Sequence, residues 1–254
     1  MIKLKTNEWE INNIETVLFD KDGTFIDLHF FWGNMTELRA KEVIKEFNLE
    51  NKYFNEICLF LGYDINTNKM LSDGITALYS RMKIIEIFKE NLKKYNVNTT
   101  DEKLAKIFDK VSNDFYQNMQ EYTKPIKEAI DFIKEIRKTN VKIGIVTSDA
   151  KESTIKTLKQ FEWENLFDVV IGRESSEHTK ESGIPTKLAL AELKANPNST
   201  IMIGDAPMDY ISAKNAGIKK TILVATGQIN KEILKKTSPY TINSLKEIEL
   251  FWIF

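Results

Sequence analysis

From about residue 125 onward, short apolar runs alternate regularly with segments of helical periodicity. The run at 141–147 (VKIGIVT) precedes a helical pattern at 151–161 (KESTIKTLKQF), and 167–172 (FDVVIG) is the next apolar run. The alternation continues with a helix at 185–195, a strand at 199–205, a helix at 207–217 and a strand at 219–226. Short apolar runs that alternate with helices predict βαβ units. We therefore expect an α/β fold with a doubly wound, Rossmann-like parallel sheet.

Between about residues 28 and 122 the pattern changes to helical periodicity alone. The segments at 34–47, 75–92 and 102–119 are amphipathic, with apolar residues spaced along one helix face. They are not interrupted by the short β-branched runs that a sheet requires. This part of the chain is expected to be all-helical.

The helical segment begins directly after the apolar run and turn at 18–27 (LFDKDGTFID), so it interrupts the sheet domain. We expect a core domain made of residues 1–27 and 123–254, and an inserted helical domain of residues 28–122. His29 and Trp32 lie where the chain leaves the core. For these two residues, contact with a substrate and packing in an aromatic cluster are both open.

The composition argues against several classes of partner. The 36 basic and 37 acidic side chains give a formal net charge of -1, without the basic excess of a nucleic-acid binder. No window approaches the roughly 18 apolar residues of a membrane span. The single cysteine, Cys58, excludes an internal disulfide and a zinc cluster and suits the reducing cytoplasm. The aromatic tail LFWIF fits a docked final element or a dimer patch, and the oligomeric state is open.

Polar residues follow the expected strands at their carboxyl ends, where open α/β sheets bind their ligands. Each group alone also fits a turn or a helix cap. Together they place carboxylates, hydroxyls and one ammonium at a single edge of the sheet. These residues are Asp20 and Asp22, Thr147 and Ser148, Asp205 and Asp209, and Lys180 in a polar loop.

This mixture has a chemical logic. Carboxylates held close together repel one another, and a bound divalent cation keeps them ionised; hard oxygen ligands favour Mg²⁺. A phosphate dianion then binds beside the cation, with Lys180, a hydroxyl and the helix N-terminus after Ser148 as donors. Attack by one carboxylate on phosphorus gives an aspartyl phosphate that water hydrolyses, while a second carboxylate transfers protons.

The motifs DKDGT, IVTSDA, Lys180 and GDAPMD resemble, in order and spacing, the four motifs of the haloacid dehalogenase superfamily. The resemblance covers residues 14–26 and nearly all of 125–245. It implies a phosphoglycolate phosphatase-like hydrolase whose segment 28–122 is a C1-type helical cap that closes over the substrate. Relatives often carry a proline-rich sequence after the lysine of the third motif, whereas this chain reads TKESGIPTKLALAEL, and alignment from LALAEL selects Lys180 over Lys187.

The resemblance also implies individual roles. Asp20 is the expected nucleophile and a Mg²⁺ ligand, and Asp22 is the expected general acid and base and a Mg²⁺ ligand through its backbone carbonyl. Asp205 is a further Mg²⁺ ligand, and Asp209 is a supporting acidic partner. Thr147, Ser148 and Lys180 are expected to bind phosphate, with Thr147 and Lys180 counted among the catalytic residues.

We therefore expect a magnesium-dependent phosphatase that acts on a small phosphorylated metabolite. A phosphomutase of the same superfamily and a non-catalytic protein that binds a phosphate ligand are the alternatives. Haloacid dehalogenation is disfavoured, because a dehalogenase does not need the acid at Asp22 or the metal-binding carboxylates. Phosphonate cleavage is disfavoured, because the phosphonate-cleaving relatives lack an aspartate at the position of Asp22. A phosphorylated receiver domain is opposed by the DxDGT arrangement and by the large insert.

Overall fold

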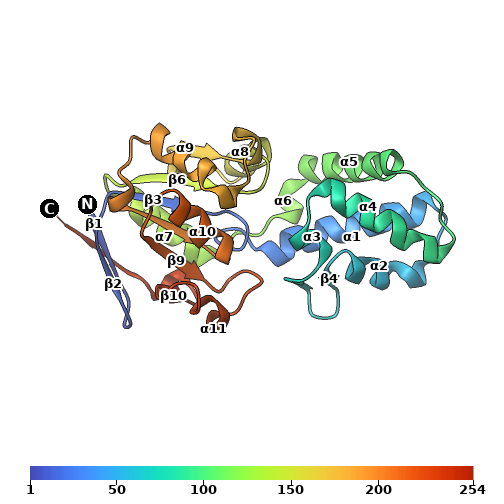
Figure 1. Cartoon of the computed structure of the whole chain (residues 1–254), viewed down its shortest axis with the longest axis horizontal. Helices are drawn as coiled ribbons and strands as arrows, with labels where there is room; N and C mark the ends of the chain where they lie inside the picture. The colour runs from blue at the N-terminus through green and yellow to red at the C-terminus, as the bar shows by residue number, and fades with distance from the viewer. Residues whose placement is uncertain (254) are drawn as a thin grey trace. The chain divides into compact units, whose positions relative to one another are not determined.

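The computed structural model describes residues 1–253. Its core is a six-stranded parallel sheet in the order β10-β9-β8-β3-β6-β7 (Figure 1), which confirms the predicted fold class. The strands are β3 (Thr16–Phe19), β6 (Lys142–Val146), β7 (Val169–Ile171), β8 (Thr200–Gly204), β9 (Lys220–Val224) and β10 (Thr241–Ile242). All four residues of β3 are buried, because β3 pairs with β6 on one side and β8 on the other.

The connections between these strands carry the core helices. They are α7 (Lys127–Arg137), α8 (Lys151–Gln160), α9 (Ile184–Glu192), α10 (Pro207–Asn215) and α11 (Lys231–Leu234). Short 3₁₀ turns η3 (Glu164–Leu166), η4 (Arg173–Ser175), η5 (Lys180–Ser182), η6 (Pro197–Ser199) and η7 (Leu245–Glu247) complete the loops. Apolar residues of α9 and α10 pack with Leu18 and Met202 of the central strands in one buried cluster. The core is therefore layered as helices on a parallel sheet.

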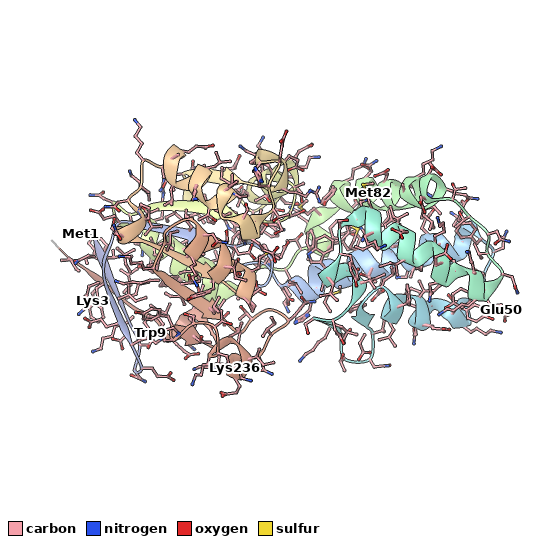
Figure 2. All side chains as sticks on the ribbon, in the orientation of Figure 1. Met1, Lys3, Trp9, Glu50, Met82 and Lys236 are labelled. Atoms are coloured by element: carbon pink, nitrogen blue, oxygen red, sulfur yellow. The ribbon has the colours of Figure 1, made fainter. Side chains whose placement is uncertain are left out.

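A second sheet, which the sequence did not predict, joins the two ends of the described chain. Strands β1 (Ile2–Lys5), β2 (Glu10–Ile14) and β11 (Glu249–Trp252) pair antiparallel in the order β11-β1-β2. Lys3, on β1 (Figure 2), lies with its ammonium 5.0 Å from the ring centre of Phe251. The aromatic tail up to residue 253 is thus docked as an edge strand, although Trp252 stays 52% exposed.

Residues Leu28–Lys124 form a compact unit distinct from the unit made of Met1–Asp27 and Pro125–Phe254. The inserted unit contains α1 (Leu28–Glu46), α2 (Phe54–Phe60), α3 (Ile75–Leu78), α4 (Arg81–Leu92), α5 (Asp101–Gln117) and α6 (Met119–Tyr122), with the 3₁₀ turns η1 (Asn51–Tyr53) and η2 (Lys93–Tyr95). Its buried apolar cluster includes Cys58 and Phe108. None of the helices among residues 1–253 is long and apolar enough to cross a membrane.

The expectation of an all-helical insert is wrong in one element. Strands β4 (Tyr63–Asp64) and β5 (Lys69–Met70) form a two-stranded antiparallel ribbon. The turn between them is held locally, because the Asp64 carboxylate accepts hydrogen bonds from the Asn66 backbone and the Thr67 hydroxyl. Two-residue strands carry no periodic signal, so the helical periodicity on either side hid them.

The two aromatic residues at the start of the insert have contacts within the helical unit. The His29 ring nitrogen Nδ1 accepts a hydrogen bond of 3.1 Å from the Met70 backbone. Trp32 packs against the buried cluster and makes an edge contact with Phe31. Both residues of α1 therefore have contacts within the helical unit, and contact with a substrate stays a prediction.

Candidate active site

The turn after β3 begins the candidate site. Asp20 follows the buried strand directly, and its backbone N–H donates to the Ile203 carbonyl of β8 at 2.8 Å. The chain then folds tightly back, with the Lys21 carbonyl accepting from three successive N–H groups, those of Thr24, Phe25 and Ile26. This turn needs a glycine, because Gly23 has a φ of +84°. The DKDGT sequence thus holds Asp20 at the carboxyl edge of the central strand.

Three carboxylates meet at this edge. Asp20, Asp205 and Asp209 each offer an oxygen, and these atoms lie within 4.8 Å of one another. All three residues are buried, with exposed fractions of 8%, 6% and 1%. The neighbouring positions of β3 and β8 bring Asp20 and Asp205 together, and α10 brings Asp209. The strand order therefore assembles an acidic cluster from distant segments.

The backbones of two glycines, Gly23 and Gly227, pack closely against the Asp205 carboxylate. A Cβ atom added to Gly23 would lie 2.4 Å from the Asp205 Oδ2 atom, and one added to Gly227 would lie 1.7 Å from it. Such distances are far inside van der Waals contact, so neither glycine tolerates a side chain without movement of Asp205. The backbone is built to approach this carboxylate closely.

Lys180 is the cation of the cluster. It lies on η5, and its ammonium is 2.6 Å from Asp20 Oδ1 and 2.5 Å from Asp209 Oδ1. Burial opposes the charged ammonium, but the attraction of Asp20 and Asp209 outweighs it and raises the pKa of Lys180. Lys187, the other lysine of this region, is exposed on α9.

One ammonium does not balance three carboxylates. Burial raises the pKa of Asp20 to about 7, although Lys180 opposes this effect, and the charges of Asp209 and Asp22 reinforce it. Burial, followed by repulsion from Asp20 and Asp209, raises the pKa of Asp205 well above its usual range. Without a further cation the cluster therefore holds protons near neutral pH. A buried set of hard carboxylate oxygens fits Mg²⁺ in its donor chemistry.

Asp209 both caps a helix N-terminus and belongs to the acidic cluster. It lies in the first turn of α10, where its Oδ2 atom accepts a hydrogen bond of 3.0 Å from the Ala206 backbone. Its other oxygen binds Lys180. The same carboxylate thus stabilises the helix N-terminus and completes the acidic cluster.

Asp22 lies in a second ion cluster beside the first. Its Oδ1 atom is 2.5 Å from the Lys21 ammonium, which also lies 3.1 Å from Asp149 Oδ2. The Lys21 side chain is fully buried, so these carboxylates compensate a charge that is out of contact with water. Burial acts against the charged form, but Asp22 and Asp149 raise the pKa of Lys21. Lys21 thereby ties the DKDGT turn to the loop after β6.

Neither Lys21 nor Asp149 was predicted as a site residue. The available signal was a lysine between two aspartates at the end of an otherwise apolar strand. A lysine in such a place is buried only if it is paired. The identity of the second partner, Asp149, is not visible without the fold.

The two hydroxyl residues after β6 are placed differently from each other. Thr147 is 3% exposed, and its Oγ1 atom accepts a hydrogen bond of 3.1 Å from the Asp149 backbone. Ser148 is exposed and lies with its Oγ atom 3.6 Å from the Met208 sulfur. Within residues 1–253, no hydrogen bond joins either hydroxyl to the three carboxylates. Their predicted contacts with phosphate stay predictions.

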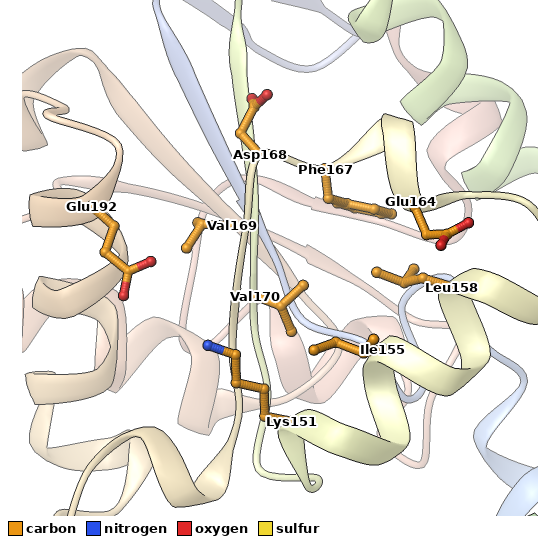
Figure 3. Close-up of a pocket in the computed structure, with 9 residues that line it drawn as sticks. All are labelled: Lys151, Ile155, Leu158, Glu164, Phe167, Asp168, Val169, Val170 and Glu192. Atoms are coloured by element: carbon orange, nitrogen blue, oxygen red, sulfur yellow. The ribbon is translucent and has the colours of Figure 1, made fainter.

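A cavity of about 350 Å³ lies elsewhere in the core, between α8, β7 and α9 (Figure 3). Its walls include the apolar side chains of Ile155 and Leu158 and the charged side chains of Lys151 and Glu192. None of the predicted site residues lines it. The acidic cluster and this cavity are therefore separate features of the core.

Comparison with known proteins defines the class to which this fold and site belong. Residues 17–224 match the family model described as "Haloacid dehalogenase-like hydrolase". The chain belongs to this family, so the predicted superfamily and the prediction of a hydrolase are confirmed.

The chain is also similar to individual proteins and solved structures. The chain is 26% identical to "Pyrophosphatase PpaX" of Bacillus mycoides over 92% of its own length and 95% of that protein. Among solved structures it is similar to a "predicted phosphoglycolate phosphatase" from Haemophilus somnus, with a TM-score of 0.70, 14% identity and coverage of 93% and 97% of the two chains. It is also similar to CbbY from Rhodobacter sphaeroides, solved with phosphate, with a TM-score of 0.64, 16% identity and coverage of 92% and 96%. These two structures support the fold.

Proposed function

We propose that this protein is a magnesium-dependent phosphatase that hydrolyses a small phosphorylated metabolite through an aspartyl phosphate on Asp20. The observation that carries the proposal is the buried cluster in which Lys180 contacts Asp20 and Asp209 while Asp205 lies alongside. Membership of the hydrolase family and likeness to a protein named as a pyrophosphatase point to the same chemistry.

Asp20 and Asp205 are the side chains that would hold Mg²⁺, with the Asp22 backbone carbonyl as the further ligand implied by the family and Asp209 as the supporting acidic residue. The bound ion supplies positive charge that keeps the carboxylates ionised and lets a phosphate dianion approach them. Lys180 is positioned to bind a phosphate oxygen, because its ammonium already lies against the expected nucleophile. Lys180 thus favours an anionic substrate and holds it beside the nucleophile Asp20.

The chemistry proceeds in two steps. In the first, an Asp20 oxygen attacks phosphorus, the bond from phosphorus to the ester oxygen breaks, and the leaving oxygen takes a proton from Asp22. In the second, water attacks the phosphorus of the aspartyl phosphate, Asp22 accepts its proton, and phosphate leaves with Asp20 restored. The contact of 2.5 Å with the Lys21 ammonium positions the Asp22 carboxyl group, which gives up its proton in the first step and takes one back in the second.

The site also fits transfer of the phosphoryl group to a second substrate alcohol, so a phosphomutase is the alternative. The names of the PpaX relatives add inorganic pyrophosphate to the substrates to be tested.

We further propose that residues 28–122 serve as the family's cap. We also propose that the protein works in a reducing cytoplasm, where Cys58 stays a free, buried thiol.

The test is release of inorganic phosphate from small phosphomonoesters and pyrophosphate, with Mg²⁺ and with EDTA. We expect magnesium-dependent turnover that Asp20→Asn abolishes. Asp131→Asn is the matched control, because Asp131 is an exposed aspartate on α7 whose one ion pair among residues 1–253 is with Lys127, at 2.6 Å. Full activity of Asp20→Asn would exclude the covalent mechanism. Isomerised sugar phosphate in place of free phosphate would identify a mutase.

A further inference from the structure

Arg39 of α1 is a buried arginine inside the helical unit. Only 7% of the residue is exposed. Its guanidinium carbon lies 4.5 Å from the ring centre of Phe108 on α5, an arrangement typical of a cation–π contact. The side chain is therefore held between two helices and is largely removed from water.

No carboxylate compensates this charge. Among residues 1–253, no acidic side chain forms an ion pair with Arg39, and its buried Nε atom has no hydrogen-bond acceptor. Burial, and next the nearby charge of Arg81, lowers the pKa of Arg39 to about 10. Arg39 still carries its full charge at neutral pH. An unpaired buried charge is rare in native proteins, because its lost hydration has to be replaced by other contacts.

A second arginine adds to the positive charge at this place. Arg81 is the first residue of α4, and its Nη2 atom donates to Asp109 Oδ1 at 2.6 Å and to the Ala105 carbonyl at 3.2 Å. The Asp109 carboxylate is thus bound to Arg81, whose side chain remains 39% exposed. Both arginines contact the same stretch of α5, Arg39 at Phe108 and Arg81 at Ala105 and Asp109, and of the two only Arg81 has an ion pair with a carboxylate among residues 1–253.

We propose that Arg39 and Arg81 form a binding site for a small oxyanion, a phosphate or carboxylate group, inside the helical unit. Guanidinium groups bind such anions through paired N–H donors, and the orphaned Nε of Arg39 is a donor of this kind. The N-terminus of α4, a helix of 12 residues, adds further positive potential beside Arg81. The site consists of residues of the helical unit alone and does not rest on the proposed phosphatase activity.

The experiment measures thermal unfolding in EDTA at constant ionic strength, with chloride replaced stepwise by inorganic phosphate or, in a second arm, by succinate. EDTA removes Mg²⁺, the cation that would let a phosphate dianion approach the three carboxylates of the core. We expect the Tm of the wild type to rise by about 3–5 °C for each tenfold excess of the anion over its dissociation constant. The arm with the larger rise shows whether phosphate or carboxylate is preferred.

Arg39→Met keeps the apolar stem and removes the charge. We expect this variant to be more stable than the wild type in chloride, because an uncompensated buried charge is gone, and to lose the rise in Tm with the anion. Lys180→Met is the control for the core site, and its rise with the anion should equal that of the wild type.

Two results would overturn the proposal. One is an Arg39→Met variant that is less stable than the wild type in chloride and keeps the whole rise, since Arg39 would then serve only to pack on Phe108. The other is loss of the rise in Lys180→Met, which would assign the anion to the core. If Arg39→Met does not fold, Arg81→Gln replaces it, and an undiminished rise in that variant refutes the site. The phosphatase proposal is tested separately, by comparing phosphate release by the wild type and by Asp20→Asn. The anion site and the phosphatase activity can therefore fail independently.

Discussion

Lys180→Met is the substitution that tests the electrostatic design of the core most directly. The wild-type ammonium lies 2.6 Å from Asp20 and 2.5 Å from Asp209, and the three side chains are 3%, 11% and 2% exposed. Methionine fills a similar volume without the charge. The substitution therefore leaves buried carboxylates facing one another with their cation removed.

The expected loss of stability follows from this burial. Removing one partner of a buried ion pair costs about 3–5 kcal/mol, because the other partner stays buried and uncompensated. In metal-free protein the cost depends on pH, since Lys180 opposes the rise in the pKa of Asp20, which is already about 7. Without Lys180 this pKa is higher still, so protonation relieves the repulsion in mildly acidic solution. We expect the full loss near pH 8 and a smaller one near pH 6.

The assay is urea unfolding of wild type and variant at both pH values, with EDTA and with Mg²⁺. Bound Mg²⁺ should restore part of the lost stability, with a gain of about 2.7 kcal/mol at one hundred times its dissociation constant. Lys187→Met is the matched control, an exposed lysine on α9 expected to change stability by less than about 0.5 kcal/mol. A loss below about 1 kcal/mol at pH 8 in EDTA, or equal losses at both pH values, would refute the reasoning.

Three further predictions concern the same region. The raised pKa values of Asp20 and Asp205 stabilise metal-free protein fully below their unfolded values near 3.8, and this contribution is lost as pH rises through about 7. The Tm in EDTA should therefore fall over that range, and Asp205→Asn should flatten the fall; an unchanged slope would contradict the pKa shifts. Lys21→Met should cost about 3–5 kcal/mol in urea unfolding, because Asp22 and Asp149 lose their shared cation, and a neutral result would show that this ion cluster is not stabilising. Gly23→Ala should lower phosphatase activity at least tenfold, because Gly23 has a φ of +84° and the added Cβ atom would lie 2.4 Å from Asp205 Oδ2. Wild-type kinetics of this variant would disprove the prediction.

Local patterns were enough to predict the central parallel sheet. Each of β3, β6 and β8 is a short apolar run bounded by turn residues, so the strands are visible within windows of a few residues. The antiparallel sheet was not visible in this way. The pairing of β1 with β11 sets Ile2 opposite Trp252, and no local pattern connects segments so far apart in the sequence. The β4–β5 ribbon was missed for another reason, because its two-residue strands are too short to show a period.

The sequence by itself determined the types of residue that end each strand and, through the four motifs, the family to which the chain belongs. Only the tertiary structure decided which of those residues meet. Strand order is set by packing between distant segments, and it places β8 beside β3, so that Asp205 joins Asp20. The loop at η5 brings Lys180 into contact with Asp20, while Lys187, seven residues later, faces solvent. The fold also decided that Lys21 is buried with two carboxylate partners, whereas Arg39 is buried without one among residues 1–253.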